Sequence, residues 1–145
     1  MRRYLLDTNH LSKAIDPNGL VARRIVAAQR NGHRVGVCQP VLCELEAGMR
    51  FVSRPRPYRK SLDQLLKQVR VWPMDVPMTQ LYGDLFAELR GKGRVLSSVD
   101  MMLTALARQY DCIVLTADRD FNAVSDLTVE NWLADLSESE EKDER

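Results

Sequence analysis

The chain has 145 residues and a net charge of +1, with 45% hydrophobic and 28% charged residues, which is ordinary for one soluble globular domain. No apolar run approaches 18 residues, and Asp7 interrupts the N-terminal one, so we expect neither a membrane span nor a signal peptide and place the protein in the cytoplasm. The three cysteines show no C-x-x-C spacing, which argues against a disulfide framework or a zinc site.

Apolar periodicity and turn residues predict the elements of the first half of the chain. They are a short buried strand at 3–7, a short helix within 10–19, a helix at 20–31, a second buried strand at 34–38 and a helix at 40–52. Two prolines then interrupt the pattern at 54–60, and we expect the next helix only at 61–69.

The second half continues the alternation of strands and helices. The pattern predicts a strand at 69–73, a helix at 79–91, a loop at 91–94, a helix at 97–110, a strand at 112–116, a turn at 117–126 and a last strand at 127–132. Such alternation is typical of an α/β sandwich around a parallel sheet. We expect one domain over residues 1–134 and a disordered acidic tail over 135–145, because the last nine residues hold five acids and two bases.

Carboxylates recur where the predicted strands end and the following helices begin. They are Asp7 after the first strand, Glu44 early in the helix after the second, Asp100 in the first turn of the helix at 97–110, and Asp118 and Asp120 after the fourth strand. Ligands of open parallel sheets bind beyond the carboxyl ends of the strands. If strands one and four are neighbours, these acids converge, and clustered carboxylates are typical ligands of Mg²⁺ or Mn²⁺.

Each acid also has an ordinary structural explanation. Asp7 suits the start of a helix as a cap. Asp100 completes a capping box with Ser97, with Asp in place of Glu. Asp118 and Asp120 are common turn residues, and an isolated helical Glu is usually a solvated charge. For each acid taken alone, the choice between a cap or turn residue and a metal ligand therefore stays open. Only the common placement of the acids at one edge of the sheet favours a metal site.

Four motifs in order, YLLDTNHL, CELEAG, VDMMLTALA and LTADRDF, resemble the PIN domain, and within it the VapC-type toxins of bacterial toxin–antitoxin pairs. The resemblance runs from about Tyr4 to Trp132. It implies a PIN-like three-layer sandwich over 1–134 with a parallel sheet in the order 3-2-1-4-5. It also implies a Mg²⁺- or Mn²⁺-dependent endoribonuclease that needs no His, Ser or Cys nucleophile.

The resemblance assigns roles to particular residues. The catalytic and metal-binding acids fall on Asp7, Glu44, Asp100 and Asp118, with Asp120 as a less certain ligand and Thr8, Asn9 and Thr116 as supporting polar residues. Glu46 falls on a variable position. The chain departs from the usual D-x-x-I-A pattern with Asp100-Met-Met-Leu-Thr, a difference in packing. We expect His10 to be a surface or cap-proximal residue with no obvious partner.

RNA is the implied substrate, and its phosphates require nearby positive charge. The weak candidates are Arg50, Arg54, Arg56, Arg59 and Lys60, and Arg90, Lys92 and Arg94 before Asp100. The resemblance also implies a homodimer, a small antitoxin partner and no membrane.

Three other functions stay open at this point. They are an RNA-processing nuclease outside any toxin–antitoxin pair, a non-catalytic RNA- or protein-binding module, and a phosphotransfer hydrolase. The last class needs D-x-D after the first strand, where this chain has Asp7-Thr8-Asn9.

Overall fold

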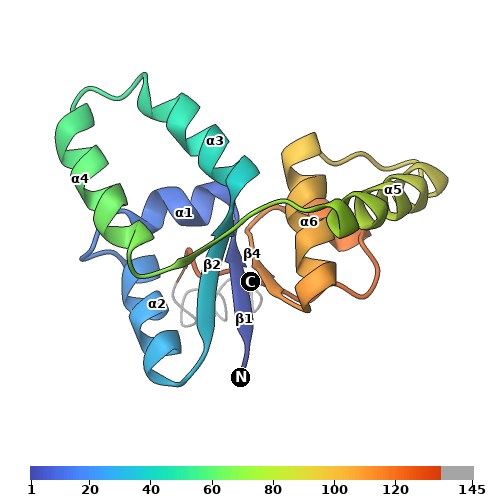
Figure 1. The fold of residues 1–145 in the computed structure, drawn as a ribbon, viewed down its shortest axis with the longest axis horizontal. Helices are drawn as coiled ribbons and strands as arrows, with labels where there is room; N and C mark the ends of the chain where they lie inside the picture. Colours follow the sequence, from blue (N-terminus) through green and yellow to red (C-terminus); the bar gives the residue numbers. More distant parts are fainter. Residues whose placement is uncertain (135–145) are drawn as a thin grey trace, which may run out of the picture.

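A computed structural model of the chain describes residues 1–134; the acidic tail expected at 135–145 lies outside the described residues. A central sheet separates two layers of helices (Figure 1). Within residues 1–134, no helix is long and apolar enough to cross a membrane.

The sheet is parallel throughout and has the strand order β3-β2-β1-β4-β5, which confirms the order 3-2-1-4-5. Its strands are β1 (Arg3–Leu6), β2 (Arg34–Cys38), β3 (Arg70–Trp72), β4 (Ile113–Leu115) and β5 (Val129–Glu130). β1 lies at the centre, with Leu5 beside Gly36 of β2 and Leu6 beside Leu115 of β4. The carboxyl ends of these three strands therefore form one edge of the sheet.

Six α-helices and one 3-10 helix complete the described part of the chain. They are α1 (Thr8–Ala14), α2 (Leu20–Arg30), α3 (Gln39–Met49), α4 (Pro55–Leu66), α5 (Val76–Gly91), α6 (Ser98–Tyr110) and η1 (Arg119–Ala123). Helices α1 to α4 lie on one side of the sheet, and α5 and α6 lie on the other (Figure 1). Helices α1 and α3 follow β1 and β2 directly, so both begin at the carboxyl edge.

Helix α1 begins at Thr8, before the predicted stretch 10–19, because Asp7 caps it. Two other predicted helix starts are wrong because of proline. Helix α4 begins at Pro55, inside the stretch expected to interrupt the chain, and α5 begins at Val76 instead of residue 79. Prolines in a first helical turn cost no hydrogen bond, because backbone N–H groups there have no partner within the helix. Asp75 strengthens the start of α5 by accepting a hydrogen bond from the backbone N–H of Met78.

The core consists of apolar side chains on both faces of short central strands. Leu5, Leu6 and Val114 are fully buried, as parallel strands covered by helices on both faces require. Gly36 of β2 lies close to β3, since a Cβ atom there would lie 2.9 Å from the carbonyl oxygen of Arg70. This position therefore favours glycine.

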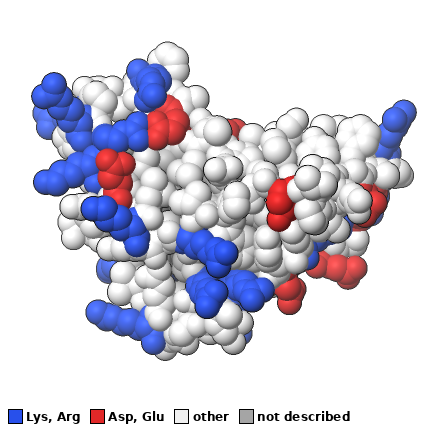
Figure 2. Space-filling view, viewed as in Figure 1, with Lys and Arg blue, Asp and Glu red and all other residues white. Residues whose placement is uncertain are grey.

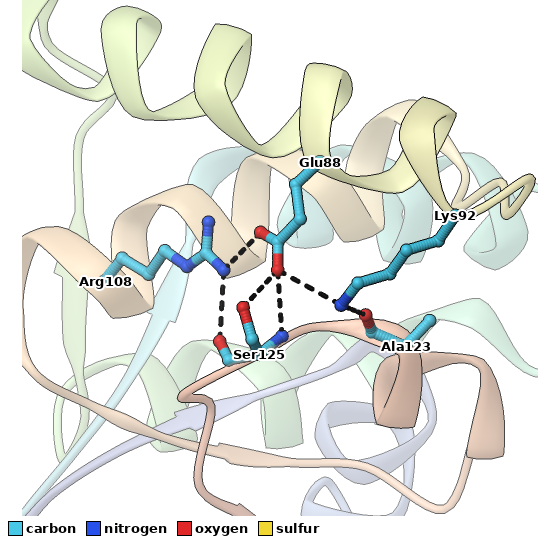
Figure 3. Close-up of polar contacts among 5 residues, drawn as sticks. All are labelled: Glu88, Lys92, Arg108, Ala123 and Ser125. Atoms are coloured by element: carbon cyan, nitrogen blue, oxygen red, sulfur yellow. Dashed lines mark hydrogen bonds and ion pairs between the residues drawn. The ribbon is translucent and has the colours of Figure 1, made fainter.

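A polar network joins α5, α6 and the segment after η1 around Glu88 (Figure 3). The Glu88 carboxylate accepts hydrogen bonds from Arg108 Nη2 at 2.6 Å and from the backbone N–H and hydroxyl of Ser125. Arg108 Nη2 also donates to the carbonyl of Ser125, and Lys92 Nζ to that of Ala123. Glu88 thereby attaches the chain just beyond η1 to the helical layer.

Lowering the pH should weaken the network around Glu88 between pH 4.5 and about 2. Hydrogen bonds from Ser125, then the contact with Arg108, lower the pKa of Glu88 from 4.5 to about 2. A carboxyl with a depressed pKa stabilises the fold fully above pH 4.5, and that contribution disappears as the pH falls toward 2. We expect Glu88→Gln to lower the free energy of unfolding by about 1–3 kcal/mol at pH 7 and by progressively less below pH 4.5, measured by urea denaturation.

The matched control is Glu46→Gln. Glu46 also contacts an arginine, but its side chain is 37% exposed and lies outside this network. Glu46→Gln should therefore lower the free energy of unfolding much less than Glu88→Gln does. A Glu88→Gln protein as stable as wild type at pH 7 would refute this role of Glu88.

Candidate active site

Asp7 lies at the junction of β1 and α1 and serves both structures. Its backbone N–H donates to the carbonyl of Leu115 at 3.1 Å, which continues the pairing of β1 with β4. Its side chain is the N-cap of α1 and accepts from the backbone N–H of His10 at 2.8 Å. Asp7 is only 7% exposed. It is both the cap of α1 and the residue at the sheet edge, the two positions that the sequence left open.

The expectation that His10 is close to a helix cap is confirmed, since its backbone N–H donates to the N-cap residue Asp7. The alternative, a surface position without an obvious partner, is wrong. His10 is fully buried, and its Nδ1 lies 2.9 Å from Asp7 Oδ1. Its Nε2 accepts a hydrogen bond of 2.9 Å from the backbone N–H of Trp132, 122 positions later in the chain. No local pattern reveals a contact between residues so far apart in sequence.

Two neighbouring glutamates of α3 have different surroundings. Glu44 Oε1 accepts a hydrogen bond of 2.7 Å from the hydroxyl of Thr8, the residue that follows Asp7. Glu46 instead forms a bidentate pair with Arg59, with both oxygen–nitrogen distances 2.6 Å. Arg50 contacts the same carboxylate at 3.5 Å. The structure therefore brings Glu44 toward Asp7 and directs Glu46 to α4.

Asp100 stands in the first turn of α6, and its backbone N–H donates to the hydroxyl of the N-cap residue Ser97 at 3.1 Å. Burial raises the pKa of Asp100, the contact with Ser97 lowers it, and the negative charges of Glu44, Asp118 and Asp7 raise it further. All four carboxylates are therefore close enough to interact electrostatically.

The segment after β4 distinguishes its two acids. Thr116 is buried and accepts a hydrogen bond from the backbone N–H of Asp118, and Asp118 in turn caps η1 by accepting from the N–H of Asp120. Asp118 raises the pKa of Asp100, whereas Asp120 is not among the charges that do so. Asp120 lies within η1, and Asn9, next to Asp7 in α1, is exposed.

The acids are near one another without forming a closed set of ligands. Among residues 1–134, no three His, Cys, Asp or Glu side chains are grouped closely enough to hold a metal ion as they stand. The negative charges of these acids nevertheless affect the pKa of a neighbouring thiol. Burial raises the pKa of Cys38, at the end of β2, to about 11, and the charges of Glu44 and Asp100 add to this rise.

Basic side chains gather in two places. Many lie on the side of the molecule that carries α4 (left in Figure 2), where a hollow of about 570 Å³ is lined by Arg50, Arg56, Arg59, Lys60 and Lys67, among others. A second hollow, of about 390 Å³, lies between the α5–α6 loop and η1 and is lined by Arg94, Arg119 and Asp120, among others.

The candidate RNA-binding residues differ in their other contacts. Arg59 is held by Glu46, and Lys92 contacts both Glu88 and the carbonyl of Ala123. Arg54, Arg56, Lys60, Arg90 and Arg94 are exposed. Arg119 was missed in the sequence, although it directly follows Asp118 and a basic neighbour of a candidate acid is a usable signal.

Comparisons with known proteins identify the fold. The family model of the PIN domain matches residues 4–127. A curated relative, ribonuclease VapC2 of Rickettsia felis, is 26% identical over 132 residues, which are 89% of this chain and 97% of the relative.

Solved structures agree with this family. VapBC2 of Rickettsia felis, bound to a DNA fragment from its promoter, has a TM-score of 0.81 and 24% identity, over 90% of this chain and 98% of that one. DNA-bound VapBC of Salmonella typhimurium has a TM-score of 0.80 and 22% identity, over 91% and 99% of the two chains. VapC20 of Mycobacterium tuberculosis, a toxin that cleaves the sarcin–ricin loop, has a TM-score of 0.62 and 19% identity, over 84% and 95%. The chain therefore belongs to the PIN domain family.

Proposed function

We propose that the protein is a Mg²⁺- or Mn²⁺-dependent endoribonuclease and the toxin of a toxin–antitoxin pair. The observation that carries the proposal is that Asp7 and Asp118 follow the paired strands β1 and β4 at one edge of the sheet, where Thr8 bonds to Glu44. The negative charges of these three acids add to the effect of burial in raising the pKa of Asp100. The curated relative named as a ribonuclease spans almost the same length and supports the choice of RNA as substrate.

The residues at this edge fit a hard divalent cation. Four carboxylates supply only oxygen ligands, which suit Mg²⁺ and Mn²⁺. Repulsion between them makes a cation favourable, and the raised pKa of Asp100 reflects that repulsion together with burial. Asp7, Glu44, Asp100 and Asp118 would hold the ion, and Asp120 would stay outside. When bound, the ion would lower the pKa of its water and offset charge on the scissile phosphate.

The chain's own residues would orient this chemistry. The hydroxyl of Thr8 holds the Glu44 carboxylate toward α1, and Thr116 fixes the backbone of Asp118. Both threonines lie next to the ends of paired strands, so they are held by the sheet itself. Asn9 is exposed beside them and is available to substrate or solvent. These hydrogen bonds limit the movement of the side chains, and the four carboxylates would draw closer together on binding the ion, because within residues 1–134 no three acids are grouped closely enough to hold it as they stand.

The hollow beside η1 offers the most direct path for RNA phosphates. Arg94 and Arg119 approach from opposite sides of it, one from the α5–α6 loop and the other from η1. Arg119 follows Asp118, so its charge lies next to the acidic edge. Phosphate contacts of this kind supply most of the affinity of non-specific RNA binding.

The antitoxin, the homodimer and the compartment belong to the same proposal. Structural neighbours from Rickettsia felis and Salmonella typhimurium are VapBC complexes, which supports a small antitoxin partner. We infer a homodimer from the resemblance to VapC-type toxins. A cytoplasmic location agrees with the free thiols of Cys38, Cys43 and Cys112.

Asp7→Asn, Glu44→Gln and Asp118→Asn should each reduce Mg²⁺-dependent cleavage of RNA by about 100-fold or more, because each removes charge from the proposed cation site. Glu46→Gln and Asp120→Asn are matched controls, two residues away from Glu44 and Asp118, and should stay near wild type. EDTA should abolish cleavage. Expression should arrest bacterial growth, and Asp7→Asn should relieve the arrest.

Two outcomes would count against the proposal. Undiminished cleavage by folded Asp7→Asn protein would contradict the metal site. Cleavage that persists in vitro while expression leaves growth unaffected would favour an RNA-processing enzyme outside a toxin–antitoxin pair.

The double variant Arg94→Ala/Arg119→Ala should weaken RNA binding, because it removes two phosphate contacts. The slope of log K against log salt should fall in magnitude by about 1–2, measured in the inactive Asp7→Asn background. The matched control is Arg56→Ala/Lys60→Ala in the hollow over α4. If only the control variant changes this slope, the RNA binds in the hollow over α4 and not in the one beside η1.

A further inference from the structure

His10 is an unusual histidine because no part of it reaches solvent and both ring nitrogens have partners. It is 0% exposed, its Nδ1 lies 2.9 Å from Asp7 Oδ1, and its Nε2 lies 2.9 Å from the backbone nitrogen of Trp132. Both ring nitrogens of a fully buried imidazole need hydrogen-bond partners. Here the two contacts join residues that are 125 positions apart in sequence.

These partners fix the position of the ring proton. The backbone N–H of Trp132 can only donate, so Nε2 must be the unprotonated nitrogen that accepts. The ring hydrogen is then on Nδ1 and points at the carboxylate of Asp7. The imidazole of His10 thus has a defined orientation and connects the segment after β5 to the end of β1.

The two donors to Asp7 act on the same oxygen. Oδ1 accepts from the backbone N–H of His10 at 2.8 Å and from its ring Nδ1 at 2.9 Å. A carboxylate held this way cannot rotate freely about its Cβ–Cγ bond, and Oδ2 takes no part in these two hydrogen bonds. Hydrogen-bonded partners of this kind orient metal-binding carboxylates in many metalloenzymes.

We propose that His10 is a positioning residue for Asp7, which presents Oδ2 of that carboxylate to the cation of the proposed nuclease site. The inference rests on the proposed function, because it assumes that Asp7 binds the ion. It adds that metal affinity depends on a hydrogen bond from a side chain that never touches the ion.

The contact of His10 Nε2 with Trp132 depends on how Trp132 itself is held in place. Trp132 is 7% exposed, and its ring lies 4.8 Å from that of Tyr4 in β1, measured between centroids. Tyr4 and Asp7 belong to the same short segment of chain. The tilted packing of Trp132 against Tyr4 thereby holds the backbone N–H that bonds to His10 close to β1.

Two substitutions separate the two hydrogen bonds of the ring. The side-chain amide of Asn places an N–H as far from Cβ as Nδ1 of histidine, so His10→Asn can keep the bond to Asp7 while losing the one to Trp132. The longer side chain of Gln reaches the position of Nε2, so His10→Gln can keep the bond to Trp132 while losing the one to Asp7. His10→Leu removes both, and Asp7→Asn removes a charge of the site itself.

The experiment is calorimetric titration of each full-length variant with Mn²⁺, with thermal unfolding measured on the same samples. We expect His10→Gln and His10→Leu to bind Mn²⁺ about 10–100-fold more weakly than wild type. His10→Asn should bind like wild type, although its melting temperature falls as far as that of His10→Gln. The Asn–Gln comparison remains decisive if His10→Leu does not fold.

The outcomes divide cleanly. Equal Mn²⁺ affinity in the Asn and Gln variants, or affinity that follows melting temperature, would show a purely structural role and overturn the inference. Wild-type binding of Mn²⁺ that survives Asp7→Asn would overturn the proposed metal site as well. Binding lost in Asp7→Asn but unchanged in all His10 variants would refute the positioning role and leave the nuclease proposal standing.

Discussion

The parallel pairing of β1 with β4 is the constraint on which the rest of the site depends. Leu6 lies beside Leu115, and the next backbone N–H, that of Asp7, still donates to the Leu115 carbonyl. This pairing places residues 7 and 116, separated by almost the whole fold in sequence, side by side at one edge. Helices that begin there direct their N-terminal, partly positive ends toward the same place, which favours carboxylates.

At this edge Asp7 is buried and Asp100 is half-buried, whereas Glu44 and Asp118 are exposed. The structure offsets the cost of burying charge with local hydrogen bonds. Asp7 is satisfied by the start of α1 and by the ring of His10, Glu44 by Thr8, and Asp118 caps η1. Burial, and then the negative charges of Glu44, Asp118 and Asp7, raise the pKa of Asp100. The acids of this edge therefore have ordinary capping and hydrogen-bonding roles in the structure, and the proposed cation site would use the same side chains.

Local patterns predicted the parts of the fold that depend on local physics. The boundaries of β2 and the Ser97 cap followed from a buried β-branched run and from capping chemistry. The strand order came from the resemblance to the PIN domain, because the pairing of strands far apart in sequence leaves no local signal. The start of α4 did not, because proline reads as a helix breaker unless its place in the first turn is known. The contacts of His10 with Trp132 and of Glu88 with Ser125 were also missed, since they join distant segments whose side chains carry no periodic signal. The preference for Asp118 over Asp120 came from the resemblance to the PIN domain; in the structure Asp118 caps η1 and Asp120 lies within it.

A crystal structure of the protein with Mn²⁺, located by anomalous scattering, tests the central claim most directly. The electron density should place the ion at the carboxyl edge of β1 and β4. We expect Asp7 to bind it through Oδ2 with Oδ1 still bonded to His10, together with Asp100, Glu44 and Asp118, directly or through water, and with Asp120 outside the ligand set. An ion bound elsewhere, or one held by Asp120 without Asp7, would contradict the assignment of this edge as the catalytic centre.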